Sequence, residues 1–310
     1  MVGINDYEGA PLTGCIRDAE KLAFMLKKNE DGSPNFHCRL LLSSQNPVTR
    51  SSLCQEVQEL LMHEADIALF YFSGHGTVNN LGGYLVTQDA EAYNEGIPMD
   101  SILSMANESK VREVIILLDC CHSGAFGQSP PTCNEKALLR EGITIITSSR
   151  STQASYEEDG GGIFTSLIYN ALDGGAADVL GNINAASLYA YVDQALGPWD
   201  QRPLFKSHVS KLSSLRRCNP DIPIETLRSL PHYFTEPADV FQLDPSFEKH
   251  FGHNHLENEK TFHSFQLLRN ARLLATIDSP HLFYAARDSK SCKLTALGRY
   301  YWKLAKEELI

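Results

Sequence analysis

The strongest constraint on the fold is a run of five apolar residues, Val114 to Leu118, that ends in the polar turn Asp-Cys-Cys-His-Ser-Gly at 119–124. An unbroken apolar run of this length, bounded by polar residues, is typical of a strand buried on both faces inside a parallel sheet. In open α/β sheets, ligands bind at the carboxyl ends of the strands. The turn at 119–124 is therefore expected to form part of a functional site.

A second apolar run has the same arrangement. Residues 66–73 end in Gly74-His75-Gly76, so a histidine stands between two glycines at a strand end. If the two strands are neighbours, a cysteine and a histidine reach the same rim of the sheet. These are the minimum components of a cysteine nucleophile with an acid–base partner.

Alternation of strand and helix patterns predicts an α/β fold over residues 1–217, with a mostly parallel sheet between helix layers. Residues 1–6 are read as the tail of a first strand that is either short or abbreviated. A Gly- and Pro-containing stretch, 125–142, is expected to be an exposed loop. The other expected strands are 39–43, 66–73, 114–118, 143–147 and an edge strand at 203–209, with a hairpin arm at 81–87. The expected helices are 14–26, 49–61, 100–107, 163–172 and 185–196.

Residues 218–310 have a different character and are expected to form a second, α-rich module. Helices are predicted at 261–274 and 294–309, with a hairpin at 282–286 between them, an order that resembles a small winged helix. Winged helices often bind DNA, but this part has 11 basic and 12 acidic residues. A nearly neutral module favours a regulatory or protein-interaction role over nucleic-acid binding.

Composition narrows the function further. The net charge of −11 argues against a general binder of nucleic acid or anionic membranes, and no apolar run approaches the roughly 18 residues of a membrane span. Eight cysteines without CxxC spacing do not indicate a disulfide framework, and the first residues lack a signal peptide. A cytoplasmic protein is expected.

Seven stretches together resemble the caspase–metacaspase family of cysteine peptidases, over about residues 1–215. In chain order they are GINDY at 3–7, Leu12 with GCIRDAEKL at 14–22, FYFSGHG at 70–76, LLDCCHSG at 117–124, ITSSR at 146–150, GIFTSLIYNALDG at 162–174 and QRPLF at 201–205. The DCCHSG form is nearer to metacaspases and their bacterial relatives than to animal caspases. The implied fold is a caspase-like sandwich.

The resemblance assigns the catalytic roles. Cys121, which immediately precedes His-Ser-Gly, is the implied nucleophile, and His75 is its acid–base partner. A thiolate is a strong nucleophile near neutral pH, and a nearby imidazole stabilises it and protonates the departing amine. The backbone N–H groups of Gly76 and Cys121 are the implied oxyanion hole. Cys120 should point to the other side of the sheet.

The family also implies a specificity pocket lined by Asp18 and Asp119, with Ser73 beside them. Two carboxylates attract a basic side chain and can hold arginine in a bidentate manner, so cleavage after Arg or Lys is expected. If Arg17 reached the pocket, cleavage after Asp would become plausible. The other alternative is a catalytically silent caspase-fold scaffold or adaptor.

No cofactor is expected to be required. Many metacaspases use calcium, and Asp89 and Asp100 fall near the relevant region, but Gln128 stands where a further carboxylate would be needed, so calcium is not favoured. No metal site is assigned, and the histidines of the loop, His250, His253 and His255, are read as surface residues.

Expected partners are protein or peptide substrates and an upstream activating protease or signalling partner that acts through the C-terminal module. Family members are often zymogens, and Lys136 and Arg140 in the loop after Cys121 are the candidate processing sites. A cell-death or antiviral-defence cascade would fit the family.

Overall fold

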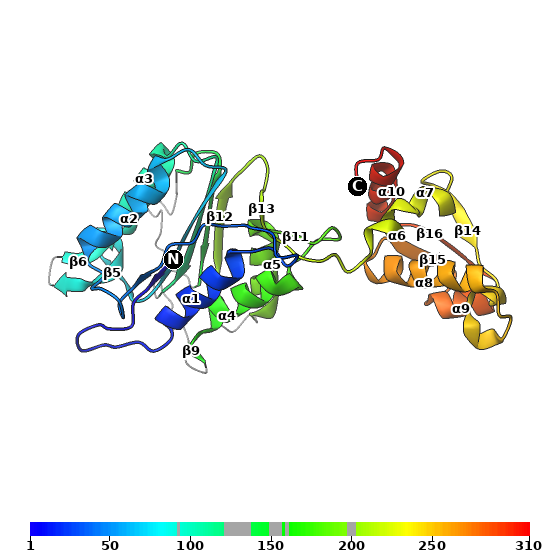
Figure 1. The fold of residues 1–310 in the computed structure, drawn as a ribbon, viewed down its shortest axis with the longest axis horizontal. Coiled ribbons are helices and arrows are strands. Elements are labelled where there is room, and N and C mark those ends of the chain that lie inside the picture. Colours follow the sequence, from blue (N-terminus) through cyan, green and yellow to red (C-terminus); the bar gives the residue numbers. More distant parts are fainter. Residues whose placement is uncertain (92–93, 121–137, 149–156, 159–160, 197–202) are drawn as a thin grey trace. The chain divides into compact units, whose positions relative to one another are not determined.

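A computed structural model describes residues 1–310 with the exception of 92–93, 121–137, 149–156, 159–160 and 197–202 (Figure 1). The chain divides into two compact units. The first comprises Met1–Ala177 and Asn182–Cys218, and the second comprises Asp178–Gly181 and Asn219–Ile310.

The first unit is built on a six-stranded sheet in the order β12-β8-β7-β3-β1-β2. Its strands are β1 (Val2–Gly3), β2 (Leu41–Leu42), β3 (Ile67–Ser73), β7 (Glu113–Asp119), β8 (Ile143–Thr147) and β12 (Leu204–His208). All pairings are parallel except that of β12 with β8, which is antiparallel at the edge. The predicted sheet is confirmed, although β2 is shorter than the expected strand at 39–43.

Two helix layers cover this sheet, as Figure 1 shows. One layer contains α2 (Arg50–Met62) and α3 (Met99–Glu108); the other contains α1 (Cys15–Leu26), α4 (Ile163–Asn170) and α5 (Ala185–Ala195), with a π-helical turn, η2 (Ala171–Gly175), after α4. Successive residues of β7 alternate between the two layers: Ile116 and Leu118 pack toward α2 and α3, and Ile115 and Leu117 toward α1 and α4. This burial on both faces explains why the strand is apolar throughout.

Smaller sheets complete the first unit. β4 (Gly76–Asn79), β5 (Gly82–Glu91) and β6 (Asn94–Pro98) form a three-stranded antiparallel sheet directly after His75, and β5 covers all but the first residue of the expected hairpin arm at 81–87. β9 (Glu157–Glu158) pairs with β10 (Gly161–Gly162), and β11 (Asn182–Asn184) pairs with β13 (Ser214–Arg217).

The second unit packs its helices around a three-stranded antiparallel sheet in the order β14-β16-β15. Its elements are α6 (Ile224–Arg228), α7 (Leu230–Tyr233), β14 (Val240–Gln242), the 3-10 turns η3 (Pro245–Phe247) and η4 (Lys249–Phe251), α8 (Leu256–Asn270), β15 (Leu274–Ile277), α9 (Leu282–Arg287), β16 (Ser291–Leu294) and α10 (Ala296–Lys306). The aromatic core is fixed by Trp302, whose indole N–H donates to the Phe234 carbonyl at 2.6 Å.

Two predictions for this unit were wrong in detail. Residues 282–286 form helix α9, not a hairpin, because Leu282, Ala285 and Ala286 are buried at helical spacing. The helix predicted at 261–274 begins earlier, at Leu256, and ends at Asn270, so that Leu274 already belongs to β15. In the part of the chain that the structure describes, no helix combines the length and apolar character needed to cross a membrane.

Candidate active site

The ends of β3 and β7 lie side by side at the carboxyl edge of the sheet. Ser73 pairs with Asp119 in the parallel register, and the Gly74 N–H donates to the Asp119 carbonyl at 3.4 Å. His75 and Cys121 each follow this last pair by two residues. Cys121 itself lies outside the described residues, but the register brings the two chain segments that carry the predicted dyad to one rim.

The His75 side chain is held by the segment that follows β1. Its Nε2 lies 2.8 Å from the Ala10 carbonyl, and its ring centroid is 4.6 Å from that of Tyr7. A carbonyl oxygen can only accept a hydrogen bond, so Nε2 carries the proton in this contact. In the neutral imidazole, Nδ1 then keeps its lone pair and is the nitrogen that can take a proton from a thiol.

Tyr7 joins this histidine to the neighbouring sheet. Its hydroxyl accepts a hydrogen bond from the His75 N–H at 3.0 Å and donates one to the Val86 carbonyl at 3.1 Å. Burial raises the pKa of Tyr7, so the hydroxyl stays protonated. A side chain at Gly74 would place its Cβ 2.4 Å from the Tyr7 oxygen, which explains the glycine before the histidine. Gly76, the predicted oxyanion donor, begins β4 and pairs with Leu85.

The structure brings Asp18 and Asp119 together. Asp18 comes from the first turn of α1 and Asp119 from the end of β7, and only 3% and 6% of their respective surfaces are exposed. Burial raises the pKa of Asp119 to about 6; the Thr165 hydrogen bond lowers it and the Asp18 charge raises it further. Ser73, the third predicted pocket residue, is also buried. Arg17 is exposed, whereas its neighbour Asp18 is buried, as expected for adjacent helical residues.

Two residues that the sequence did not single out donate hydrogen bonds to the carboxylates of Asp18 and Asp119. The Gly162 N–H donates to Asp18 Oδ2 at 2.8 Å, and the Thr165 hydroxyl donates to Asp119 Oδ2 at 2.6 Å. Because Thr165 uses its proton on Asp119, it accepts from the Tyr71 hydroxyl at 2.7 Å. Gly162 fits closely: a Cβ there would stand 2.2 Å from Asp119 Oδ2. The candidate pocket is therefore closed by the backbone of β10.

The remaining predicted residues are placed as follows. Cys120 is buried on the α2–α3 side of the sheet, with Ile116 and Leu118. Arg140 is half-buried, and its guanidinium donates to the carbonyls of Ala106, Val111 and Glu141 at 3.0, 2.7 and 2.6 Å. Lys136 and Gln128 lie outside the described residues.

Two of the candidate metal ligands have protein partners. Asp89 accepts from the Thr87 hydroxyl and the Arg50 N–H at 2.6 and 2.9 Å, and His255 caps α8 by accepting from the Asn258 N–H at 3.3 Å. Outside the omitted segments, no group of three or more His, Cys, Asp or Glu side chains is arranged to hold a metal ion.

The fold is that of an α/β protein in which the strand before His75 and the strand before Cys120 end side by side at the carboxyl edge of a parallel sheet. The family model described as "Caspase domain" matches residues 1–213. The chain belongs to the caspase domain family.

Solved structures share this fold. The protein GSU0716 from Geobacter sulfurreducens is 18% identical, with a TM-score of 0.51, over 71% of this chain and 96% of that one. Caspase-1 from Spodoptera frugiperda is 14% identical, with a TM-score of 0.52, over 70% of this chain and 88% of that one. A search of curated proteins found no match. The fold over the first unit is thus caspase-like, and the family is one of cysteine peptidases.

Proposed function

We propose that this protein is a cysteine endopeptidase that cleaves peptide bonds after Arg or Lys. The observation that supports the proposal is the β3–β7 register, because the strands that precede His75 and Cys121 in the sequence end side by side at the Ser73–Asp119 pair. The membership of the chain in the caspase domain family supports the same reaction class. No metal or organic cofactor is required by this chemistry.

The proposed reaction begins with transfer of the Cys121 thiol proton to Nδ1 of His75, the nitrogen left unprotonated by the Ala10 contact. The thiolate attacks the scissile carbonyl carbon, and the Gly76 and Cys121 N–H groups stabilise the oxyanion. His75 then protonates the departing amine, which leaves a thioester. Water, deprotonated by His75, attacks the thioester and releases the carboxylate product and the free thiol.

The preference for Arg or Lys rests on Asp18 and Asp119. A guanidinium that enters between them would replace the Gly162 N–H and the Thr165 hydroxyl as partners of the carboxylates. The closed pocket supports the proposal that the enzyme is regulated as a zymogen, since a substrate side chain requires Gly162 to move away. Asp-directed cleavage is the alternative specificity; it would need a cation in the pocket, and Arg17 lies exposed on α1 next to the buried Asp18.

Processing in the loop after Cys121 is the proposed means of activation. Lys136 is the favoured site over Arg140, whose guanidinium is already bound by three carbonyls. We expect Lys136→Ala to abolish processing and Arg140→Ala to leave it intact, as measured by the masses of the fragments. Intact processing in the double variant would rule out both sites. The C-terminal module, residues 218–310, is proposed to receive the signal; it exposes Phe283 and Tyr284 on α9.

The decisive experiment compares hydrolysis of peptide reporters ending in Arg, Lys and Asp by the purified chain, with and without calcium and a trace of activating protease. Cys121→Ala should abolish Arg and Lys cleavage, whereas the neighbouring Cys120→Ala should retain it. Cleavage after Asp would keep the reaction class and overturn the proposed pocket. A folded protein that cleaves nothing under any of these conditions would favour a silent scaffold.

A further inference from the structure

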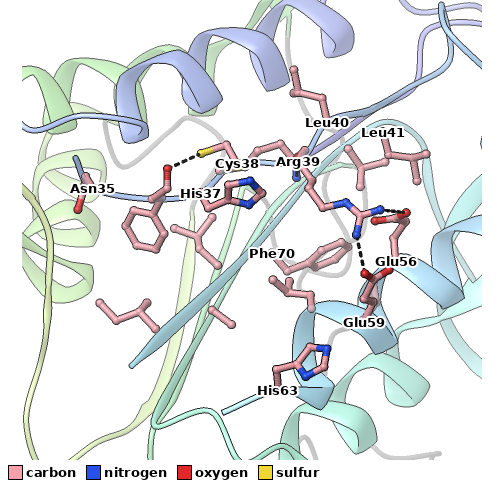
Figure 2. A pocket seen from close by; sticks show the side chains of 18 of the residues that line it. Asn35, His37, Cys38, Arg39, Leu40, Leu41, Glu56, Glu59, His63 and Phe70 are labelled. Atoms are coloured by element: carbon pink, nitrogen blue, oxygen red, sulfur yellow. Dashed lines mark hydrogen bonds and ion pairs between the residues drawn. The ribbon is translucent and has the colours of Figure 1, made fainter. Parts of the chain in front are cut away.

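A tyrosine that the proposed reaction does not use lies beside the carboxylate pocket, the pocket lined by Asp18 and Asp119. Tyr71 belongs to β3, whose side chains alternate between the two helix layers: Phe70 points toward α2, as Figure 2 shows, and Tyr71 is buried in the core on the α1 and α4 side. Tyr71 has no exposed surface. A buried tyrosine hydroxyl needs a hydrogen-bond partner, and Thr165 of α4 provides it.

The hydroxyls of Tyr71 and Thr165 form a chain that ends on Asp119. The Tyr71 and Thr165 oxygens are 2.7 Å apart, and the Thr165 oxygen lies 2.6 Å from Asp119 Oδ2. An ionised carboxylate can only accept, so Thr165 donates to Asp119 and Tyr71 donates to Thr165. In the closed pocket, both protons of this hydroxyl chain therefore have an acceptor.

A basic substrate breaks the hydroxyl chain at one point. Under the proposed function, the guanidinium takes the Asp119 oxygen to which Thr165 donates. The Thr165 proton then needs another acceptor, and because only 1% of Thr165 is exposed, that acceptor has to come from the protein. A buried donor left without a partner costs more free energy than an ordinary hydrogen bond contributes.

Tyr71 can supply the new acceptor, because a hydroxyl both donates and accepts. If the Thr165 proton turns to the Tyr71 oxygen, the Tyr71 proton needs a second acceptor of its own. Burial raises the pKa of Tyr71 well above its usual value, so the hydroxyl keeps its proton; hydrogen bonds with Thr165 and with Ser73 lower this pKa. Ser73, two residues further along the same face of β3, is thus the second acceptor within reach.

We propose that Tyr71 and Thr165 are positioning residues of the carboxylate pocket, and that the direction of their hydrogen bonds reverses when a basic side chain binds. In the closed pocket Tyr71 donates to Thr165, which donates to Asp119. In the occupied pocket Thr165 donates to Tyr71, which donates to Ser73. No covalent bond changes, and each proton stays on its own oxygen. The inference rests on the proposed function, because its ligand is a guanidinium between Asp18 and Asp119.

Tyr71→Phe separates the two arrangements. Without the Tyr71 hydroxyl, Thr165 keeps its bond to Asp119 in the closed pocket but has no acceptor in the occupied one. The variant should therefore raise KM for arginine reporter peptides about tenfold and change kcat by less than about twofold. Tyr169→Phe is the matched control, since Tyr169 is half-buried on the same helix as Thr165 and lies outside the hydroxyl chain; it should change neither constant.

A double-mutant cycle with Thr165→Val distinguishes this role from packing. Valine has nearly the shape of threonine but no hydroxyl, so the occupied pocket leaves no proton without an acceptor. Tyr71→Phe should then raise KM by less than about twofold in the Thr165→Val background, against about tenfold in the native one. Thr165→Ser keeps the hydroxyl and should respond to Tyr71→Phe as the native chain does. An equal rise in KM in all three backgrounds would mean that Tyr71 acts by packing alone, and would overturn the proposal.

Binding can also be measured without catalysis, by calorimetric titration of agmatine, a free guanidinium ligand, into the full chain with Cys121→Ala. We expect agmatine to bind, and Tyr71→Phe to weaken its binding about tenfold. Binding that Tyr71→Phe leaves unchanged would refute the reversal and leave the proposed pocket standing. Absence of both agmatine binding and cleavage after Arg would instead refute the proposed function, and the inference with it.

Discussion

Replacement of Asp119 by Asn should stabilise the folded chain at neutral pH. Only 6% of Asp119 is exposed, and burial raises its pKa from 3.8 to about 6. At pH 7 the carboxylate is ionised in both the folded and unfolded states, but its ionisation costs more in the folded one. A pKa difference of about two units corresponds to about 3 kcal/mol in the free energy of unfolding. Asparagine removes that cost and keeps a carbonyl oxygen for the Thr165 hydroxyl.

The sign of the pH dependence follows from the direction of the shift. The folded-state pKa lies above the unfolded one, so the folded state binds the proton more tightly. The destabilisation is complete above about pH 6 and disappears below about pH 4. The free energy of unfolding of Asp119→Asn should therefore exceed that of the native chain by about 3 kcal/mol at pH 7, and this difference should vanish near pH 4.

Urea unfolding followed by far-ultraviolet circular dichroism at pH 4, 5, 6 and 7 measures this difference. Asp193→Asn is the matched control, since Asp193 is exposed on α5 and should change the stability little at any of these pH values. If Asp119→Asn proved less stable than the native chain at pH 7, or equally stabilised at pH 4, the buried-charge argument would be wrong. Under the proposed function, the same variant should lose cleavage after Arg and Lys, so it would be more stable and less active.

Two further substitutions test contacts around the site, and a third tests a buried arginine on β13. Tyr7→Phe removes the acceptor of the His75 N–H and the donor to the Val86 carbonyl, so it should cost about 1–3 kcal/mol in urea unfolding and lower kcat more than it changes KM. Gly162→Ala pushes a Cβ onto Asp119 and should cost about 1–3 kcal/mol; unchanged stability would mean that β10 does not pack there. Arg216→Met removes the guanidinium that donates to the Leu172 and Lys28 carbonyls and should cost about 2–4 kcal/mol in the same assay; a loss below about 0.5 kcal/mol would contradict this.

The strands of the sheet, and the edge of the sheet at which the candidate site lies, could be predicted from local sequence patterns. β3 and β7 could be predicted because a strand buried on both faces needs an apolar residue at nearly every position, and the polar residues after each strand then fall at one edge. The local sequence pattern does not predict helix α9 in the same way. Its six residues, from Leu282 to Arg287, include aromatic residues that suit a strand, and only the burial of Leu282, Ala285 and Ala286 in the second core selects the helix.

The partners of the site residues depend on contacts between distant segments. The Ala10 carbonyl that orients His75 belongs to an irregular loop, and a backbone carbonyl leaves no mark in an amino-acid sequence. Tyr7 lies within the GINDY stretch at 3–7, but nothing in that stretch indicates that its hydroxyl reaches both the His75 amide and Val86. Side-chain identity therefore predicts which residues can react, whereas tertiary structure decides which proton each of them holds.

The closed carboxylate pocket also depends on a contact between distant segments. A substrate must displace this contact before the proposed cleavage can occur. Gly162 is 144 residues from Asp18, yet its N–H occupies the oxygen that a basic substrate would need. A guanidinium offers two hydrogen bonds and a positive charge where the amide offers one hydrogen bond from a neutral donor, so the guanidinium binds the carboxylate more strongly than the amide does. It must still displace the Gly162 N–H, and breaking a hydrogen bond to a buried charged group costs about 1.5–3 kcal/mol. The closed form should therefore bind an arginine substrate about 10- to 100-fold more weakly than a form in which β10 has moved away.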